Sequence, residues 1–575
     1  MIPYNAPVED MWFTLEKLAG FTELSSLPGW EEVTGDLARA VIGEAGKFGA
    51  EVLAPLNRDG DLRPSVLENG VVRAAEGFGA AYKQFCEGGW NSVPFEEAWG
   101  GQDLPWALAF AIGEIWQGAN LSFGLCPLLN QGAVEALQAH GADWQKQLYL
   151  PAMVEGRWAG TMNLTEPQAG SDLAQVKSRA EPDGDAWRIT GQKIFITWGE
   201  HDMAENIVHL VLARTPGAPE GSRGISLFLV PKFIPDADGN PGERNDLRCV
   251  SLEHKLGIKA SPTAVMSYGD NGGALGWMVG EENKGLACMF TMMNNARLSV
   301  GLQGVAIAER AYQQARDYAL QRVQGKSSTG ATGAIIQHAE VRRMLLDARA
   351  LIDAARAVTY FAAAELDRSH RHTDADRRAK AARNVELLTP VVKAWATDVG
   401  VRVADIGVQV HGGMGFIEET GAAQHYRDAR ILPIYEGTNG IQALDLIGRK
   451  TARDGGAAMT AFALEMEADL KAIGSAETGI VLAAISELQA ATAMVAGHAS
   501  DTDWQGAAAS AYLELAALAI GGWMMVKSLD AGSGDARREA AARHFITRFV
   551  PKAAMLKGQV GTGPEALMAL PAEAF

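Results

Sequence analysis

The chain has 575 residues, a formal net charge of −18 and a calculated isoelectric point near 5.2. A chain of this length is too long for one hydrophobic core, so we expect three or four packed regions. The acidic balance disfavours non-specific binding to nucleic-acid phosphates. The four cysteines are scattered without a CxxC pair. This spacing predicts reduced packing residues, and neither a metal site nor a disulfide framework.

The N-terminal sequence MIPYNAPVEDMWF has neither the basic-then-apolar pattern of a signal peptide nor the arginines of a transit peptide. The longest apolar run, around 513–526, carries Glu514 and a glycine pair, so we expect no membrane span. These features predict a cytoplasmic enzyme that binds neither a membrane nor nucleic acid.

Residues 1–158 are predicted to be mainly helical. The segments 35–54 and 107–120 place apolar residues three or four positions apart, as amphipathic helices do, and Gly/Pro clusters separate them. We assign 1–34 to an N-terminal extension and 35–158 to an N-terminal helical domain.

Residues 159–285 are predicted to form a small antiparallel β-domain. Short runs at 187–197, 206–213 and 224–230 are rich in Ile, Val, Leu, Phe and Trp, and turn-rich segments divide them.

Long helices are predicted again over 286–455. The segments 286–324, 338–366 and 385–407 carry apolar stripes with few breakers, which is typical of a four-helix bundle. After a glycine-rich break, residues 456–575 are Ala-rich and predicted to form an appended helical domain. The predicted fold class is therefore mainly α with a central small β-domain. Ligand sites tend to lie at such domain borders.

Two motifs lie in the predicted β-domain. The segment Met162–Asp172 reads MNLTEPQAGSD, and its small residues and hydroxyls let backbone amides approach a planar or phosphorylated ligand. The strand KIFITWG over 193–199 ends with Phe195 and Thr197, which alternation places on one face. An aromatic ring and a hydroxyl can clamp an isoalloxazine ring and hydrogen-bond its edge. Taken alone, the first motif also fits a turn that leaves a strand, and the second fits core packing.

Two further motifs lie in the predicted bundle. The run QVHGGMGF over 409–416 is a glycine-rich loop after a helix, which is a common pattern and a weak indication of phosphate or nucleotide binding. The run YEGTNGIQ places Glu436 just before a helical stretch that Thr438 or Asn439 can cap. The N-terminus of that helix favours an electron-rich ligand. On its own, Glu436 also fits an acid that complements the helix dipole.

The four motifs together, at this order and spacing, resemble the acyl-CoA dehydrogenase family over roughly residues 35–450. The matching features are TEPxAGSD, the strand ending in FIT, the arginine motif QRVQG at 321–325, QVHGGMGF and YEGT. The two ends of the chain resemble the larger bacterial subgroup of this family. The resemblance implies a helical N-terminal domain, a β-barrel-like domain and a C-terminal four-helix bundle, followed by an extra helical domain.

The resemblance also implies a reaction, which is the FAD-dependent oxidation of the α,β bond of an acyl-CoA thioester to the trans-2-enoyl-CoA. Glu436 is implied as the base that removes the α-proton while flavin N5 accepts the β-hydride. The Glu436 amide and the ribityl hydroxyl of FAD are implied to stabilise charge on the thioester oxygen. A buried carboxylate should have a raised pKa, which suits a general base. Some family members place the base where this chain has Ala296, so Glu436 is the matching candidate.

Residue-by-residue matching to the family implies the ligand contacts. The contacts to the isoalloxazine and ribityl groups are Met162, Leu164, Thr165, Gly170, Ser171, Phe195 and Thr197, and Thr438 and Asn439 contact the same FAD. The contacts to the FAD of a neighbouring subunit are Arg322, Gln324, His338, Gln409, Gly412 and Gly413. The contacts to the substrate are Ser171, Asn294, Arg297 and Gly437. The chain departs from the family at Phe195, where tryptophan is common, and in the arginine motif, which is one residue short and leaves the role of Gln324 open.

An FAD shared between subunits implies at least a dimer. The C-terminal extension resembles an appendage that stands where a second dimer packs in tetrameric family members, so we expect a homodimer, with a tetramer as the alternative. An electron-transfer flavoprotein is implied as the electron acceptor. The implied substrate is 3-methylmercaptopropionyl-CoA, an intermediate of dimethylsulfoniopropionate catabolism, which would be converted to methylthioacryloyl-CoA. Short- and medium-chain fatty acyl-CoAs are the alternatives.

Three other functions remain open from the sequence. An acyl-CoA oxidase would use O₂ to reoxidise the flavin. A DNA-associated flavoprotein of the same family would carry a basic C-terminal domain, whereas the basic residues here are scattered among alanines and acids. A non-catalytic family member is disfavoured by the intact Glu436 and FAD motifs.

Overall fold

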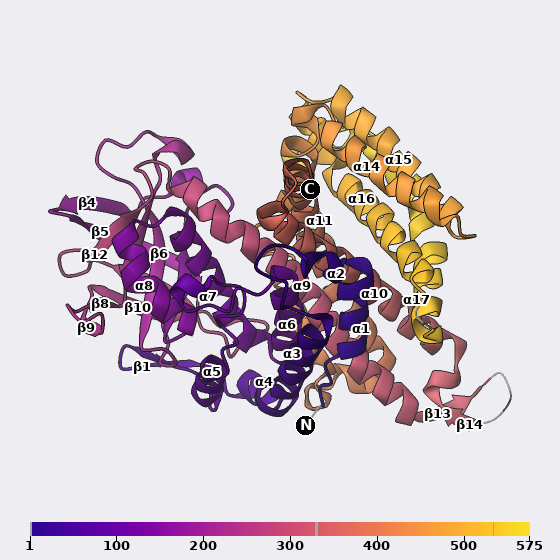
Figure 1. Cartoon of the computed structure of the whole chain (residues 1–575), viewed down its shortest axis with the longest axis horizontal. Helices are drawn as coiled ribbons and strands as arrows, with labels where there is room; N and C mark the ends of the chain where they lie inside the picture. Colours follow the sequence, from indigo (N-terminus) through magenta and orange to yellow (C-terminus); the bar gives the residue numbers. More distant parts are fainter. Residues whose placement is uncertain (1–2, 328–329, 331, 533) are drawn as a thin grey trace. The chain divides into compact units, whose positions relative to one another are not determined.

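The computed structural model describes residues 3–327, 330, 332–532 and 534–575. The chain forms two compact units (Figure 1). The first unit contains residues 47–104 and 119–296. The second contains the residues up to 46, then 105–118 and 297–575. Each unit is therefore built from segments that are far apart in the sequence.

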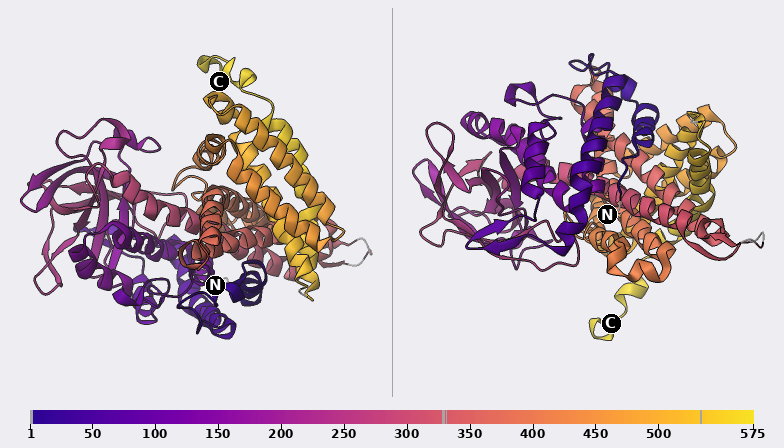
Figure 2. Two further views of the ribbon diagram at one scale, coloured as in Figure 1. Left: turned by 45° about the horizontal axis from the view of Figure 1, so that its top comes forward. Right: turned by 90° about the horizontal axis from the view of Figure 1, so that it is seen from below.

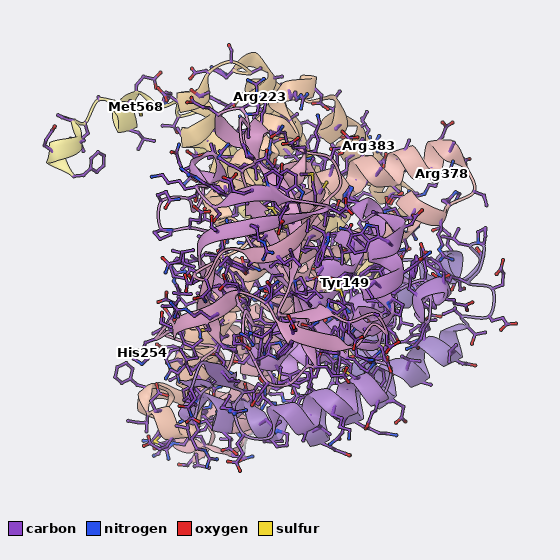
Figure 3. The ribbon with its side chains drawn as sticks, turned by 90° about the vertical axis from the view of Figure 1, so that its left-hand side faces the viewer. Tyr149, Arg223, His254, Arg378, Arg383 and Met568 are labelled. Carbon is purple, nitrogen blue, oxygen red and sulfur yellow. The ribbon has the colours of Figure 1, made fainter. Side chains whose placement is uncertain are left out.

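The helices of the first unit include two that pack on its sheet. Helix α7 (Leu121–His140) begins after Asn120, whose side chain accepts a hydrogen bond from the Phe123 amide at 3.1 Å. Most residues of α7 are buried, as expected for a helix that is apolar all round. Tyr149 of α8 (Asp143–Glu155), labelled in Figure 3, packs edge-on against Trp158, with ring centroids 5.6 Å apart. The other helices are α4 (Ala54–Leu62) and α5 (Phe78–Glu87).

The sheet of the first unit has eight strands in the order β10–β11–β5–β12–β7–β6–β3, with β4 paired to β5. The strands are β3 (Trp158–Asn163), β4 (Arg179–Asp183), β5 (Ala186–Thr197), β6 (Asn206–Ala213), β7 (Ser226–Pro231), β10 (Leu247–Leu252), β11 (Thr263–Tyr268) and β12 (Ala274–Val279). Two small hairpins pair β1 (Val66–Glu68) with β2 (Val71–Arg73) and β8 (Phe233–Pro235) with β9 (Pro241–Arg244).

The prediction of a purely antiparallel β-domain is wrong for one strand pair. β3 and β6 pair in parallel, with Trp158 opposite Asn206 and Asn163 opposite Val211. A long connection through β4 and β5 separates these strands, and parallel pairing requires such a crossover. The remaining pairs of the sheet are antiparallel.

The second unit is built on three long helices, close to where the sequence predicts them. They are α9 (Gly285–Gln321), whose first turns belong to the first unit, α10 (Ala339–Arg371) and α11 (Ala375–His411). A Cβ on Gly304 would lie 2.1 Å from the carbonyl oxygen of Ala396, so the backbones of α9 and α11 touch there. The remaining elements are α1 (Val8–Phe13), α2 (Phe21–Leu24), α3 (Gly35–Phe48), α6 (Trp106–Ala119), β13 (Val323–Lys326), β14 (Thr332–Ala334), α12 (Ala422–Ala429) and α13 (Asn439–Leu444).

An appended group of helices follows, as predicted (Figure 2). It contains α14 (Ala457–Ile473), α15 (Thr478–Gly497), α16 (Thr502–Asp530), α17 (Ala536–Arg548), α18 (Ala553–Val560) and α19 (Glu565–Met568). By length and composition, α15 and α16 could each cross a membrane. The most apolar window of α16 is 83% buried inside the protein, which is the behaviour of a core helix.

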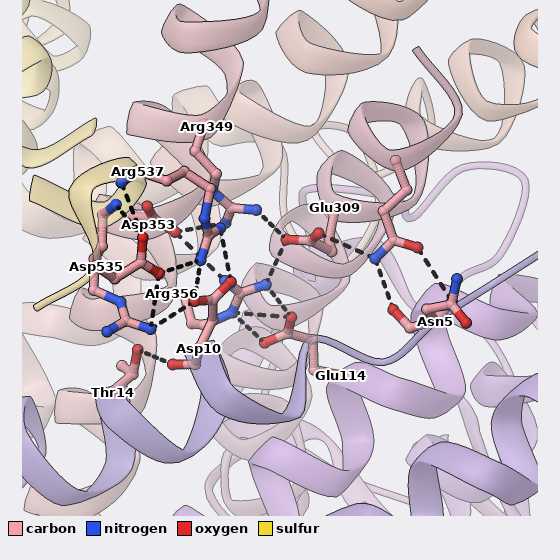
Figure 4. Close-up of polar contacts among 12 residues, drawn as sticks. Asn5, Asp10, Thr14, Glu114, Glu309, Arg349, Asp353, Arg356, Asp535 and Arg537 are labelled. Carbon is pink, nitrogen blue, oxygen red and sulfur yellow. Dashed lines mark hydrogen bonds and ion pairs between the residues drawn. The ribbon is translucent and has the colours of Figure 1, made fainter. Parts of the chain in front are cut away.

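A largely buried group of charged side chains joins the N-terminal helix to the long helices and to the appended group (Figure 4). Its acids are Asp10, Glu114, Glu309, Asp353 and Asp535, and its bases are Arg349, Arg356, Arg538 and the exposed Arg537. At its centre, Arg356 of α10 donates to Glu114 of α6 at 2.6 Å and to Glu309 of α9 at 2.9 Å. At its edge, Asp10 of α1 accepts from Arg537 of α17 at 2.5 Å.

Candidate active site

Glu436 lies in the second unit, in the loop that leads into α13. Its backbone is left-handed, with φ of 55°, and Gly437 follows with φ of 82°. A Cβ on Gly437 would lie 2.8 Å from Nε2 of Gln442 and 3.9 Å from Nη2 of Arg297, so only glycine fits. A left-handed residue other than glycine costs about 1–3 kcal/mol and persists where its surroundings fix it, often at functional sites.

Side chains from two helices fix this base loop, which we define as residues 435–439. The Tyr435 hydroxyl donates to Oε1 of the fully buried Gln303 on α9. Nε2 of Gln442 on α13 lies 3.3 Å from the carbonyl oxygen of Glu436 and 3.4 Å from that of Gly437. The backbone on both sides of the carboxylate is therefore anchored.

The capping prediction for α13 is confirmed at Thr438. Its Oγ1 accepts a hydrogen bond from the Ile441 amide at 3.2 Å. The neighbouring Asn439 turns its side-chain amide toward α11 instead, where Nδ2 lies 2.8 Å from Oδ1 of Asp398. Any contact of Asn439 with a cofactor would therefore use its backbone.

Burial and nearby positive charges have opposite effects on the pKa of the Glu436 carboxyl group. Burial raises its pKa above the ordinary value, while the positive charges of Arg297 and Lys393 lower it. Arg297 of α9 is 5% exposed, and burial lowers its pKa against the opposing effect of Asp445 and Glu436. The result is a carboxylate with raised proton affinity beside two cations, which suits a general base.

Sequence reasoning missed three residues that hold this loop through hydrogen bonds, which are Lys393, Gln303 and Gln442. Lys393 has one visible signal, because it is the only charge within the apolar helical run LLTPVVKAWA. Its side chain is fully buried, and a buried charge in a helix calls for a specific partner. Gln303 and Gln442 carry no comparable signal in the sequence.

The first unit positions the segment Met162–Asp172 through Glu166. This carboxylate accepts hydrogen bonds from the Lys177 amide at 2.7 Å, from the Ser178 hydroxyl at 2.6 Å and from the Lys193 ammonium at 2.8 Å. Burial alone would raise its pKa, but Lys193 and these donors lower it to about 2. Glu166 thus holds the segment in place through these hydrogen bonds. Gly170 and Ser171, which follow it in the segment, are exposed.

Phe195 and Thr197 lie beside this segment in the same unit. The Ile194 amide donates to the Thr165 carbonyl at 2.9 Å, and the Thr161 hydroxyl donates to the Thr197 carbonyl at 2.8 Å. Strict alternation fails at Phe195, which has φ of 60° and sits where the β5–β11 register shifts. Ile196 is therefore the buried residue, and Phe195 and Thr197 flank it.

This part of the first unit fits the planar flavin that the resemblance implies. The Phe195 ring is 58% exposed at the end of a strand, where it contributes little to the core. The nearby Thr165 and Thr197 are partly exposed hydroxyl donors. An exposed aromatic ring next to such donors is the arrangement that binds a flat, polar-edged ring system.

The residues predicted to reach a neighbouring subunit form two exposed groups in the second unit. In the hairpin group, Nε2 of His338 lies 2.9 Å from the Gln324 carbonyl oxygen, and Arg322 is exposed just before β13. In the loop group, Gln409, Gly412 and Gly413 are exposed around the end of α11. A Cβ on Gly412 or Gly413 would meet nothing within 4 Å, so there is room for a ligand to approach both backbones.

The predicted substrate residues are distributed over both units. Arg297 and Gly437 are brought together at the base loop. Asn294, one turn before Arg297 on α9, is exposed and belongs to the first unit, as does the exposed Ser171.

Comparison with protein families matches four successive models to this chain. They are "Acyl-CoA dehydrogenase, N-terminal domain" over 38–157, "Acyl-CoA dehydrogenase, middle domain" over 161–270, "Acyl-CoA dehydrogenase, C-terminal domain" over 283–451 and "Acetyl-CoA dehydrogenase C-terminal like" over 457–571.

Similar proteins agree with these matches. The chain is 54% identical to the 3-methylmercaptopropionyl-CoA dehydrogenase of Ruegeria pomeroyi, over 80% of this chain and 78% of that protein. It is 36% identical to a butyryl-CoA dehydrogenase of Syntrophomonas wolfei, over 79% and 77%. Among solved structures, Caenorhabditis elegans ACDH-11 in complex with C11-CoA has the same fold, with a TM-score of 0.78 at 22% identity over 96% of this chain and 92% of that one.

Proposed function

The chain belongs to the acyl-CoA dehydrogenase family, and we propose that Glu436 is the base with which it oxidises the α,β bond of an acyl-CoA thioester. The observation that carries this proposal is the base loop. There, a carboxyl group with a raised pKa is fixed in a left-handed conformation beside Arg297 and Lys393.

The residues of the loop have separate roles in the proposed reaction. The Glu436 carboxylate takes the α-proton, and its backbone N–H donates to the thioester oxygen, where negative charge develops. Gly437 leaves room beside that oxygen because it has no side chain. Arg297 offsets the negative charge of the carboxylate before it takes the proton. FAD, the cofactor of the family, supplies the acceptor for the β-hydride when it is bound.

We assign the FAD contacts in two sets. Met162, Leu164, Thr165, Gly170, Ser171, Phe195, Thr197, Thr438 and Asn439 hold the FAD of the same subunit. Arg322, Gln324, His338, Gln409, Gly412 and Gly413 reach the FAD of a second copy. The exposed position of every member of the second set except the partly exposed His338 supports this division. Ser171, Asn294, Arg297 and Gly437 are assigned to the substrate.

We propose a homodimer, because the second set would reach the FAD of a second copy. Apolar side chains are exposed around the same two groups, which are Leu320, Val323, Met414, Phe416 and Ile417. Phe416 is 85% exposed, and large apolar side chains gathered in this way mark interaction surfaces. Light scattering on wild type and on Phe416→Asp tests the proposal, because the substitution should shift the protein toward monomer and lower its FAD content.

The proposed substrate is 3-methylmercaptopropionyl-CoA, supported by the 54% identity to a dehydrogenase named for it. The product would be methylthioacryloyl-CoA. Butyryl-CoA is the second candidate, supported by the 36% identity to a butyryl-CoA dehydrogenase. We further propose an electron-transfer flavoprotein as electron acceptor and the cytoplasm as location.

Anaerobic bleaching of the flavin by a panel of acyl-CoAs tests the reaction and ranks the substrates. Wild type should bleach fastest with 3-methylmercaptopropionyl-CoA. Glu436→Gln should retain its flavin and bleach about 10²–10⁴-fold more slowly, because general base catalysis contributes that much. The matched control is Glu386→Gln, which changes an exposed carboxylate paired with Lys450 at 3.0 Å in the same unit. Equal rates for the two variants would refute Glu436 as the base.

A further inference from the structure

Helix α11 presents a fully buried lysine to the base loop. Lys393 is 0% exposed, and its ammonium donates to Oδ1 of Asn439 at 2.9 Å. That hydrogen bond goes to a neutral amide and not to a carboxylate, which is unusual because buried ammonium groups are normally paired with acids. The positive charge of Lys393 can therefore act on a carboxylate beyond its hydrogen-bond partner Asn439, and Glu436 is such a group.

Asn439 ties this lysine to the loop. Its Nδ2 lies 3.0 Å from the Ala394 carbonyl oxygen, 3.0 Å from Oγ1 of Thr397 and 2.8 Å from Oδ1 of Asp398. One side chain thus reaches two successive turns of α11. Asn439 is the first residue of α13 and stands three residues after Glu436. Holding Asn439 therefore limits how far the end of the base loop can move.

The charged groups around Lys393 come from several elements. Glu436 of the loop and Asp398 of α11 favour its charge, and Arg297 of α9 opposes it. Asp398 also faces Glu514 of α16 and Arg430 at the end of α12. Burial is the largest influence and lowers the pKa of Lys393 to about 8, so the ammonium is mostly charged at pH 7.

Glu436 faces two cations of different kinds. Arg297 stays protonated throughout the range in which enzymes work, because a guanidinium holds its proton more tightly than an ammonium. Arg297 also faces Asp445 and Arg449 in addition to Glu436. Lys393 is therefore the neighbour whose charge changes near neutral pH.

We propose that Lys393 is a positioning residue for the proton-abstracting step, which holds the base loop through Asn439 and keeps the Glu436 carboxylate charged until substrate arrives. The inference rests on the proposed role of Glu436. It adds a fully buried residue of α11 that acts on the reaction only through Glu436 and Asn439.

This role predicts how the rate of flavin reduction, divided by the apparent substrate dissociation constant, depends on pH. The rate rises along an acid limb that reports the loss of the proton from Glu436. The charge of Lys393 helps to set where this limb lies on the pH scale, because it lowers the pKa of Glu436. A purely structural lysine would leave the acid limb unchanged when it is replaced.

The test is anaerobic stopped-flow reduction of the FAD-loaded enzyme across roughly pH 4–9, which covers ordinary carboxyl pKa values and values raised above them, with the acyl-CoA that bleaches wild type fastest. Lys393→Met should move the acid limb upward by about one pH unit, because it removes a positive charge that lowers the pKa of Glu436. Lys393→Arg keeps the charge, so it should return the acid limb toward its wild-type position. Asn439→Ala should slow reduction without moving the acid limb.

Lys450→Met is the matched control, because Lys450 pairs with the exposed Glu386 in the same unit and should leave the profile unchanged. An acid limb that stays in place in Lys393→Met would overturn the inference, and so would an acid limb that moves as far in Lys393→Arg as in Lys393→Met. Failure of the proposed function is a separate result, in which no acyl-CoA bleaches even the wild-type flavin.

Discussion

Replacing Arg356 with methionine should loosen the second unit far more than replacing an exposed arginine of the same unit. Arg356 is fully buried and donates to Glu114 at 2.6 Å and to Glu309 at 2.9 Å. Burial disfavours its charge, but these two carboxylates raise its pKa well above the ordinary value. Methionine fills much of the same space and leaves both carboxylates without their shared cation.

The expected cost follows from that uncompensated charge. Removing one partner of a buried ion pair destabilises a protein by about 3–5 kcal/mol. Because 1.4 kcal/mol corresponds to a factor of ten, the opening of α6 and α10 should become roughly 10²- to 4 × 10³-fold more frequent. The pKa of Glu309, which burial raises and Arg349 and Arg356 together hold at about 2, should rise in the variant.

Hydrogen–deuterium exchange of the α6 and α10 amides measures this opening directly. The control is Arg39→Met, which breaks an exposed pair with Glu9 and should leave exchange unchanged. In the double variant Arg356→Met with Glu114→Gln, part of the protection should return, because Glu309 keeps its pair with Arg349 and the carboxylate that lost its cation is now neutral. Exchange within tenfold of wild type in the single variant would refute the reasoning.

Three further changes have defined outcomes. Gly437→Ala should slow flavin bleaching by about 10²-fold or more with flavin content unchanged, since the new Cβ meets Nε2 of Gln442 at 2.8 Å; Gly440→Ala, whose Cβ has ordinary contacts, is the control. Phe195→Ala should weaken FAD binding by roughly tenfold without lowering the melting temperature of the apoprotein, because the lost ring is 58% exposed. Glu166 has a folded-state pKa of about 2, below its ordinary 4.5, so it stabilises the fold above about pH 4.5 and that contribution disappears as the pH falls toward 2. At pH 7, Glu166→Gln should therefore have a free energy of unfolding lower than that of wild type by on the order of 3 kcal/mol. Its melting temperature should lie below that of wild type at pH 7, and this difference should disappear in acid.

The helices could be predicted from the sequence because their periodicity is local. The segment 385–407 lies inside the observed α11, 338–366 lies inside α10 except for its first residue, and 286–324 nearly coincides with α9. The parallel pairing of β3 with β6 could not be predicted, because strand partners are chosen by packing between distant segments. The bulge at Phe195 could not be predicted either, because an argument from alternating residues assumes that β5 pairs with its neighbour without a shift in register.

The candidate site was predictable where its residues are contiguous. The run YEGT places Glu436, Gly437 and Thr438 together, and the cap at Thr438 follows from local chemistry. The residues that fix the loop from α9 and α11, Gln303 and Lys393, are far away in the sequence. Their contribution depends on the crossing of two helices at Gly304, and no single-sequence pattern reports such a crossing.

The base loop combines a rigid backbone with an adjustable charge, and the two properties have different sources. Rigidity comes from neutral hydrogen bonds, from Tyr435 to Gln303 and from Gln442 to the loop carbonyls. The charge of Glu436 is set by burial, which raises its pKa, against Arg297 and Lys393, which lower it. Because these contacts are distinct, a substitution in the first group should change the rate at every pH, and a substitution of a cation should change where on the pH scale the rate rises. Asn439 accepts a hydrogen bond from Lys393 but carries no charge, so its replacement should act as a substitution in the first group does.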